Sequence, residues 1–157
     1  KLEVAGGSGT ATISINNTTD GRSGSFGIDS NGVYIQNSNN GDYFDLKFIH
    51  LKEVKAVYDR ASLIALDEEL RQKYVKHLSD IISDGVRILL LTLNYPQHQR
   101  IGPPFAVSKS EIDSLYMGSF QCRELECIND IENEPMFLLQ GVDFVEKAVY
   151  CLQKVRT

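Results

Sequence analysis

The stretch V-Y-D-R-A-S-L-I-A-L, residues 57–66, decides the fold of this chain together with R-I-L-L-L-T-L-N-Y-P at residues 87–96. Near-continuous runs of Val, Ile and Leu are typical of parallel strands that helices cover on both faces. In an open α/β sheet, ligands bind just beyond the carboxyl ends of such strands. The polar residues near the ends of the two runs therefore mark the predicted ligand edge: Asp59, Arg60, Asn94 and Tyr95.

The remaining pattern alternates strands and helices, which predicts a single α/β domain over residues 1–157 with its core at residues 33–157. Residues 1–32 are rich in Gly, Ser, Asn and Thr, with A-T-I-S-I as their one strand-like alternation, and we expect an irregular loop or hairpin there. In the core, we expect strands at residues 33–36, 54–58, 87–93, 121–126 and 147–152.

Two helices have clear start signals. The first begins near Asp67, with acidic residues in its first turn and Gly85 as a stop beyond its end. The second begins at Ser108, where S-K-S-E predicts a capping box with Glu111.

The composition of the chain limits the classes of partner that it is expected to bind. The chain has 157 residues, 42% of them hydrophobic, a net charge of −5 and no run rich in Lys or Arg. Nucleic acids and anionic membranes are bound by clustered positive charge, so we expect neither, and a small-molecule partner is favoured. No apolar run approaches the roughly 20 residues that span a bilayer, and residues 1–4 do not resemble a signal peptide, which predicts a cytoplasmic protein.

The cysteines and histidines do not predict a metal site. Three cysteines lack C-x-x-C spacing, so we expect reduced, buried thiols, and three histidines lie far apart in the chain. These residues are Cys122, Cys127, Cys151, His50, His77 and His98.

Five motifs in order carry a resemblance: G-D-Y-F-D-L at residues 41–46, Y-D-R-A-S-L-I-A-L at 58–66, L-R-Q-K-Y at 70–74, L-T-L-N-Y-P at 91–96 and G-P-P-F at 102–105. Their spacing resembles that of the thiopurine S-methyltransferase family. The resemblance implies a Rossmann-like, S-adenosylmethionine-dependent methyltransferase sheet, mostly parallel, with an antiparallel C-terminal hairpin. It also implies transfer of a methyl group to a small thiol or thiopurine-like acceptor, or to a selenium or tellurium compound.

The resemblance implies the cofactor contacts. Asp42 would accept a hydrogen bond from the adenine amine and Tyr43 would flank the ring, whereas the alternative is a turn residue beside an ordinary aromatic. Arg60 matches the family arginine at the cofactor and substrate site, where it would orient an anionic group. Asp59 would fix the direction of Arg60, whereas the alternative is a helix cap that pairs with Arg60 on the surface.

The same resemblance implies an apolar acceptor wall, because two consecutive prolines and Gly102 would make a preorganised loop. A rigid loop that only packs on the sheet is the alternative. The family commonly has Trp-Gly where this chain has Gln140-Gly141, and the chain has no tryptophan, which weakens a preference for thiopurines. The wall residues are Tyr95, Pro103, Pro104 and Phe105.

The resemblance covers only the carboxyl-terminal two thirds of a family member. Residues 6–9, G-G-S-G, look like a cofactor loop, but T-A-T-I-S-I-N-N-T-T-D-G follows them and predicts no helix, so we favour a plain loop. We therefore expect a sheet that lacks its N-terminal strands, completed by a missing N-terminal segment or a second chain. A fragment, a cleavage product, the ordered part of a longer protein and a degenerate relative stay open. The rival function is a truncated, non-catalytic binding module.

Overall fold

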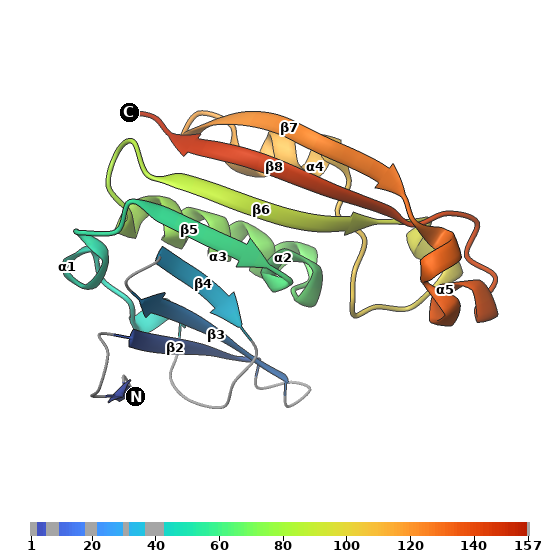
Figure 1. The fold of residues 1–157 in the computed structure, drawn as a ribbon, viewed down its shortest axis with the longest axis horizontal. Helices are drawn as coiled ribbons and strands as arrows, with labels where there is room; N and C mark the ends of the chain where they lie inside the picture. Colours follow the sequence, from blue (N-terminus) through green and yellow to red (C-terminus); the bar gives the residue numbers. More distant parts are fainter. Residues whose placement is uncertain (1–2, 6–9, 18–21, 30–31, 37–42, 157) are drawn as a thin grey trace.

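The computed structural model describes residues 3–5, 10–17, 22–29, 32–36 and 43–156, with side chains from Tyr43 onward. The described strands form one sheet in the order β1-β2-β3-β4-β5-β6-β8-β7 (Figure 1). The strands are β1 (Glu3–Ala5), β2 (Thr10–Asn17), β3 (Arg22–Asp29), β4 (Gly32–Gln36), β5 (Ala56–Arg60), β6 (Arg87–Asn94), β7 (Phe120–Asn129) and β8 (Glu146–Lys154). The helices are η1 (Tyr43–Asp45), α1 (Phe48–Leu51), α2 (Ser62–Ala65), α3 (Glu68–Ile81), η2 (Gln97–Gln99), α4 (Lys109–Tyr116), η3 (Ile131–Asn133) and α5 (Pro135–Leu139).

The α/β class is confirmed, but the expectation of a mostly parallel sheet is wrong. Only the pairings β4–β5 and β5–β6 are parallel among the described strands. The other pairings, β1–β2, β2–β3, β3–β4, β6–β8 and β7–β8, are antiparallel. The predicted antiparallel C-terminal hairpin is present as β7 and β8, and β8 lies between β6 and β7.

Residues 1–32, where we expected an irregular loop or hairpin, contain the described strands β1, β2 and β3. β2 contains the predicted A-T-I-S-I alternation, and β1 and β3 pair with it on either side. β3 reads R-S-G-S-F-G-I-D, whose two glycines give it a weak strand signal. Pairing with β2 and β4 stabilises β3 as a strand, although its own sequence has only a weak preference for strand. Residues 6–9, the glycine cluster, lie outside the described residues.

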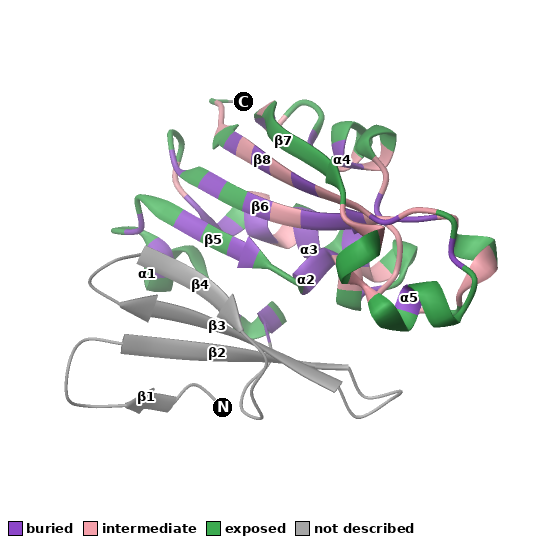
Figure 2. Cartoon of the chain, turned by 45° about the vertical axis from the view of Figure 1, so that its right-hand side comes forward, coloured by how far each residue is buried: buried purple, intermediate pink, exposed green. Residues whose placement is uncertain are grey.

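The described helices cover one face of β5, β6 and β8, whereas the apolar runs predicted cover on both faces. α2, α3 and α4 lie behind the sheet in Figure 1. Burial alternates along β5 and along the first part of β6, as the striped strands in Figure 2 show. Ile88 and Leu90 are fully buried toward the helices, whereas Leu89 is 40% exposed and its neighbour Tyr58 is 37% exposed.

We call the uncovered side the open face. Cross-strand partners point to the same side of a sheet, so the pairing register defines its members. Its members include Tyr58 and Arg60 on β5, Arg87, Leu89 and Leu91 on β6, Val149 and Cys151 on β8, and Arg123 and Glu126 on β7.

Both predicted helix starts are confirmed. Asp67 caps α3 by accepting a hydrogen bond from Leu70 N at 2.9 Å. Ser108 Oγ accepts from Glu111 N at 3.2 Å at the start of α4. The second half of the predicted capping box is replaced, because the Glu111 carboxylate accepts from Arg71 instead.

The cysteines are free, but the expectation that they are buried is wrong. Cys127 is exposed, and Cys122 and Cys151 are half-buried. Partial burial raises the pKa of the Cys122 thiol, which disfavours its thiolate. No helix in the described part of the chain is long and apolar enough to cross a bilayer.

Candidate functional site

The candidate site lies at the carboxyl ends of β5 and β6, which are parallel and so end at the same edge of the sheet. Arg60 is the last residue of β5 and Asn94 the last of β6. Between Arg60 and α2, Ala61 adopts a φ of 78°, in the left-handed region that a residue with a Cβ seldom occupies. Such strain persists where the surrounding structure enforces it, which is common at functional sites.

Arg60 is exposed at this edge, on the open face. Its guanidinium has no ion pair with any residue that the structure describes. The expectation that Asp59 orients Arg60 is wrong, and so is the alternative of a surface pair between them. Adjacent residues of a strand point to opposite faces, and Asp59 points into the core.

Asp59 is fully buried and its carboxylate Oδ2 accepts a hydrogen bond from the Tyr74 hydroxyl at 2.8 Å. Burial raises the pKa of Asp59 to about 6, and the Tyr74 hydrogen bond opposes that rise. Ser62 also lowers this pKa in part, although neither Ser62 Oγ nor Asp59 Oδ1 reaches hydrogen-bond geometry with a described residue. Asp59 is thus a core acid behind the strand end, at the start of α2.

Tyr43 also lies in the core. Its hydroxyl donates to Tyr74 O at 3.0 Å, and its ring stacks on Tyr74 with centroids 4.7 Å apart. Burial raises its pKa well above the ordinary value, so the phenol stays neutral. The ring is 0% exposed, so a role against an adenine stays a prediction. Asp42, the other residue expected at the adenine, lies outside the described residues.

The predicted acceptor loop is held by its own hydrogen bonds. Tyr95 is buried, and its hydroxyl donates to Pro104 O at 2.7 Å. Phe105 N donates to Ile64 O at 2.6 Å, which ties the loop to α2. Pro103, Pro104 and Phe105 are half-buried and keep some exposed surface. Tyr95 therefore supports the loop from the buried side, and the other three residues are partly exposed to solvent.

Gly102 is required for this loop to close. A Cβ at Gly102 would lie 2.4 Å from Phe105 Cδ1 and within 2.8 Å of two further ring atoms. A methyl group at that position needs the Phe105 ring to move, since real Cβ contacts do not approach so closely. The glycine therefore fixes where the Phe105 ring sits.

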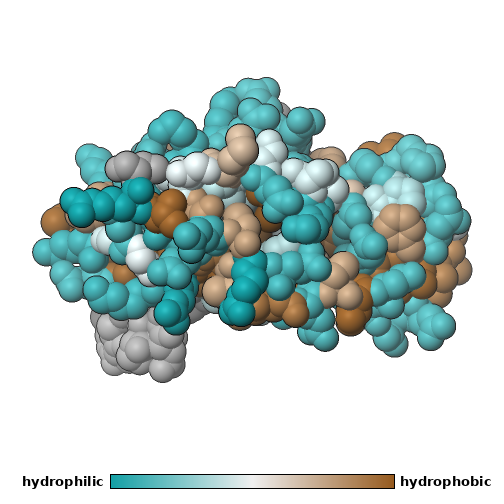
Figure 3. Space-filling model, turned by 90° about the horizontal axis from the view of Figure 1, so that it is seen from above, coloured by the Kyte–Doolittle hydropathy of each residue, from teal (hydrophilic) through white to brown (hydrophobic). Residues whose placement is uncertain are grey.

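A small second core supports the same edge. Leu93, Tyr95, Phe137, Val142 and Val145 form a separate buried cluster under α5. The Tyr95 and Phe137 rings meet edge to face at 5.2 Å. At the right of Figure 3, apolar residues stand among hydrophilic ones. The exposed large hydrophobic residues of α5 and of the segment after η2 are Met136 at 61%, Leu138 at 49%, Leu139 at 82% and Ile101 at 94%.

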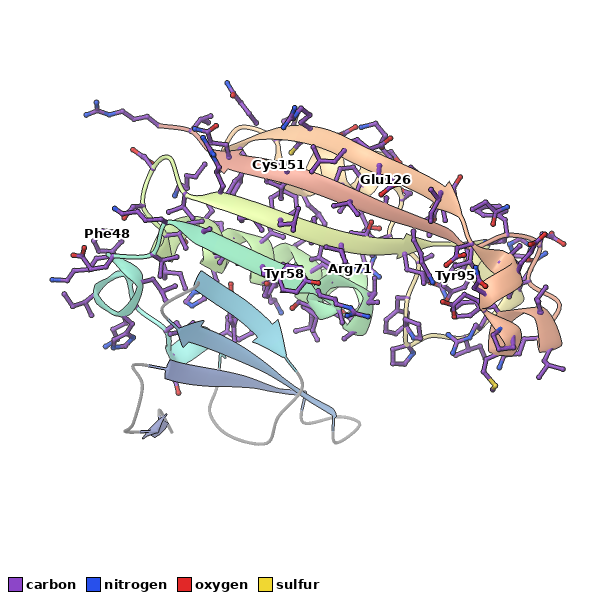
Figure 4. The ribbon with its side chains drawn as sticks, viewed as in Figure 1. Phe48, Tyr58, Arg71, Tyr95, Glu126 and Cys151 are labelled. Atoms are coloured by element: carbon purple, nitrogen blue, oxygen red, sulfur yellow. The ribbon has the colours of Figure 1, made fainter. Side chains whose placement is uncertain are left out.

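Arg71 is a residue of the site region to which we assigned no role from the sequence. It is 4% exposed, and its Nε donates to Leu63 O at 2.8 Å and to Leu66 O at 2.9 Å. Its Nη1 pairs with Glu111 at 2.6 Å, and its guanidinium lies 6.0 Å from the Phe105 ring centroid (Figure 4). A buried arginine needs such partners. The available signal was an arginine within the L-R-Q-K-Y motif on the apolar side of a helix.

The described residues contain no cluster of three or more His, Cys, Asp or Glu side chains that would hold a metal ion.

Comparisons with known proteins show the family of this chain. Residues 23–155 match the family model described as "Thiopurine S-methyltransferase". A thiopurine S-methyltransferase of Nitrosospira multiformis is 41% identical over 124 residues, which cover 79% of this chain and 55% of that protein. Those of Pseudomonas aeruginosa PAO1 and of Xanthomonas campestris pv. campestris 8004 are each 40% identical over 114 residues, 73% of this chain and 52% of theirs. The chain spans about half the length of these relatives, and its match over residues 23–155 makes it a member of the thiopurine S-methyltransferase family.

Proposed function

We propose that this chain carries the acceptor side of an S-adenosylmethionine-dependent S-methyltransferase. The acceptor is a small thiol or thiopurine-like compound, or a selenium or tellurium compound. The observation that carries the proposal is Arg60 at the carboxyl end of β5, exposed and without an ion pair to any described residue. The loop of Pro103, Pro104 and Phe105 extends from the same sheet edge. Membership of the family supports the reaction type.

Among the residues assigned to the cofactor, Arg60 fits it best. An exposed guanidinium that no described residue pairs with suits a carboxylate such as that of S-adenosylmethionine. Tyr43 does not fit in its described position, because its hydroxyl is occupied and its ring is buried. Bound at this edge, the cofactor supplies a methyl group on a sulfonium.

The acceptor loop and Arg60 have separate tasks in this proposal. The half-buried Pro103, Pro104 and Phe105 offer an apolar surface that aligns the acceptor and excludes water. Alignment of two reactants is a large part of what such a transfer needs. Arg60 orients the acceptor or the cofactor by charge. Aromatic thiols ionise readily, so no dedicated base is required.

A chimera tests the proposal, since the chain spans about half the length of its curated relatives. Residues 23–155 replace the matching stretch of the Nitrosospira multiformis relative. Methyl transfer from S-adenosylmethionine is then measured with a panel of aromatic thiols, selenols and tellurium compounds, and cofactor binding is measured by calorimetry. The unmodified relative and the Arg60→Ala chimera are the controls.

The proposal predicts methyl transfer by the chimera to at least one member of the panel. A chimera that folds, binds the cofactor and transfers no methyl group favours the non-catalytic binding module. A folded chimera that does not bind the cofactor contradicts the enzyme reading.

A further inference from the structure

A second arginine, for which the sequence predicted no role, lies at the acceptor loop. Arg100 follows η2 and precedes Gly102 by two residues. Its Nη1 donates a hydrogen bond to Pro104 O at 3.2 Å, the carbonyl that also accepts from Tyr95. Its guanidinium lies 4.7 Å from the centroid of the Phe137 ring on α5. Arg100 therefore lies between the acceptor loop and α5, at the end of the sheet where Figure 4 labels Tyr95.

The positive charge of Arg100 has no opposite charge beside it among the residues that the structure describes. No described carboxylate forms an ion pair with its guanidinium. Its Nε is buried without an acceptor, and its hydrogen bond to the loop uses Nη1. Contact with the Phe137 ring stabilises a cation. A charge taken out of water still costs free energy unless an opposite charge pairs with it, and a bound anion would supply that partner.

Three carboxylates of the neighbouring segments are already engaged. Asp143 accepts a hydrogen bond from the Gln99 side chain at 2.5 Å, and its backbone N donates to the same side chain at 3.0 Å. Asp130 and Glu134 each pair with Lys147 at 2.6 Å. Each of these acids would have to give up its present contacts to become the partner of the arginine.

Arg60 and Arg100 differ in how strongly they can hold an anion. Arg60 is exposed, whereas Arg100 is half-buried against an aromatic ring. Opposite charges attract more strongly where water is excluded, so the same carboxylate is held more tightly at Arg100. Two exposed apolar residues lie next to it, Ile101 in the chain and Met136 beside Phe137. A ligand with an apolar body and one acidic group suits both features.

We propose that Arg100 binds a carboxylate of the acceptor, which makes the acceptor an aromatic thiol that carries an acid group. This inference rests on the proposed acceptor surface of Pro103, Pro104 and Phe105. The carboxylate accepts hydrogen bonds from the guanidinium, and the aromatic ring of the acceptor lies against the loop. The thiol of the acceptor remains free to receive the methyl group. Arg100 is an acceptor-binding residue in this arrangement, and Arg60 serves the cofactor.

The test compares para-mercaptobenzoate with its methyl ester, because the two thiols differ by one negative charge and little in shape. Methyl transfer by the chimera that carries residues 23–155 gives kcat/KM for each. The acid should be preferred by at least about tenfold. Arg100→Met should remove that preference by raising the KM of the acid, with kcat/KM of the ester unchanged within about twofold.

Three further variants separate charge from packing. Arg100→Lys keeps the charge without the planar guanidinium and should recover part of the preference for the acid. Arg100→Gln can still donate to Pro104 and should lose the preference as Arg100→Met does, which serves if Arg100→Met does not fold. Arg87→Met removes a positive charge at the opposite end of β6 and, as the matched control, should preserve the preference. A variant of Arg100 that lowers kcat/KM for acid and ester alike shows that Arg100 only supports the loop, and overturns the inference.

Binding of the products separates this inference from the proposed function. Calorimetry measures the affinity of the chimera for para-(methylthio)benzoate and for its methyl ester, so no methyl transfer is needed. An inactive chimera that binds the acid at least about tenfold more tightly, and loses this difference in Arg100→Met, contradicts the proposed function and supports the anion site. Equal affinities, or a preference that survives Arg100→Met, overturn the inference whether or not the thiols are methylated.

Discussion

Asp59 and Arg60 are adjacent in sequence, but their side chains lie in different environments. Strand alternation places Asp59 in the core under Tyr74 and Arg60 in solvent at the sheet edge. The pair was expected to work as one unit, because two adjacent polar residues at a strand end look alike in the sequence. The partner that settles the role of Asp59 is Tyr74, 15 residues away on α3, and only the packing of α3 on β5 brings it there.

Loss of Arg60 should reduce catalysis more than stability. In the active chimera, Arg60→Ala should lower kcat/KM at least about tenfold, which is roughly 1.4 kcal/mol of transition-state stabilisation, because alanine cannot orient an anionic group. Arg60→Lys should recover little if both guanidinium nitrogens contact the ligand. Steady-state kinetics and thermal melts measure the two effects. Unchanged activity in Arg60→Ala would place Arg60 among ordinary surface residues.

Asp59 should make stability depend on pH in a defined window. Its pKa is about 6 in the folded state against an ordinary value of 3.8, so the folded chain holds this proton where the unfolded chain has lost it. Its contribution to stability therefore falls as the pH rises from about 4 to about 6, by roughly 3 kcal/mol. Asp59→Asn removes that dependence and still accepts from Tyr74.

The measurement is the difference in unfolding free energy between Asp59→Asn and the parent chain across pH 4 to 8. The difference should grow in favour of asparagine up to about pH 6 and then stay level. Asp84→Asn, at an exposed position, is the control and should give a small difference throughout. A flat profile for Asp59→Asn would mean that Asp59 titrates as it does in water.

At the scale of helices and loops, the sequence predicted the structure where contacts between residues close in the chain determine it. Asp67 and Ser108 were predicted as helix starts, and each accepts a hydrogen bond from the backbone three residues on. The acceptor loop was expected to be rigid from its prolines and Gly102. The loop is held by two hydrogen bonds, from Tyr95 to Pro104 and from Phe105 to Ile64. They join segments that no local sequence pattern connects.

The position of Phe105 should depend on Gly102. Gly102→Ala in the chimera forces the ring away from its place, so the KM for the acceptor should rise several-fold while kcat changes less. Gly118→Ala is the matched control. It has a φ of +83° and open space around its Cβ, so it should cost about 1 kcal/mol of stability without altering KM. Equal KM values for both variants would remove Phe105 from the acceptor wall.

At the scale of the whole molecule, the described helices cover one side of the sheet, which the sequence did not predict. Four leucines in R-I-L-L-L-T-L read as a strand buried on both faces, because a run of one residue type carries no sign of which side is covered. Charged residues do indicate which side of a strand is exposed. Arg60, Arg87 and Arg123 all fall on the open face once the register is known, but the register depends on which strands become neighbours.

Adjacent leucines on β6 should therefore differ in their contribution to stability. Leu90→Ala should cost about 2–5 kcal/mol, because Leu90 is 0% exposed in the main core. Leu89→Ala should cost less than about 1 kcal/mol, because Leu89 is 40% exposed on the open face. Denaturant unfolding of the 157-residue chain measures both. Equal losses would contradict a one-sided sheet.

The place of β8 between β6 and β7 sets when this half of the molecule is completed during synthesis. β8 (Glu146–Lys154) is the last of the described strands along the chain, yet it joins β7 to the rest of the described sheet. A ribosome that has finished β7 has made a strand with no neighbour, and β6 still has a free edge. The nascent chain therefore keeps both strand edges unpaired until β8 emerges, and a premature stop codon before residue 146 leaves both edges uncovered.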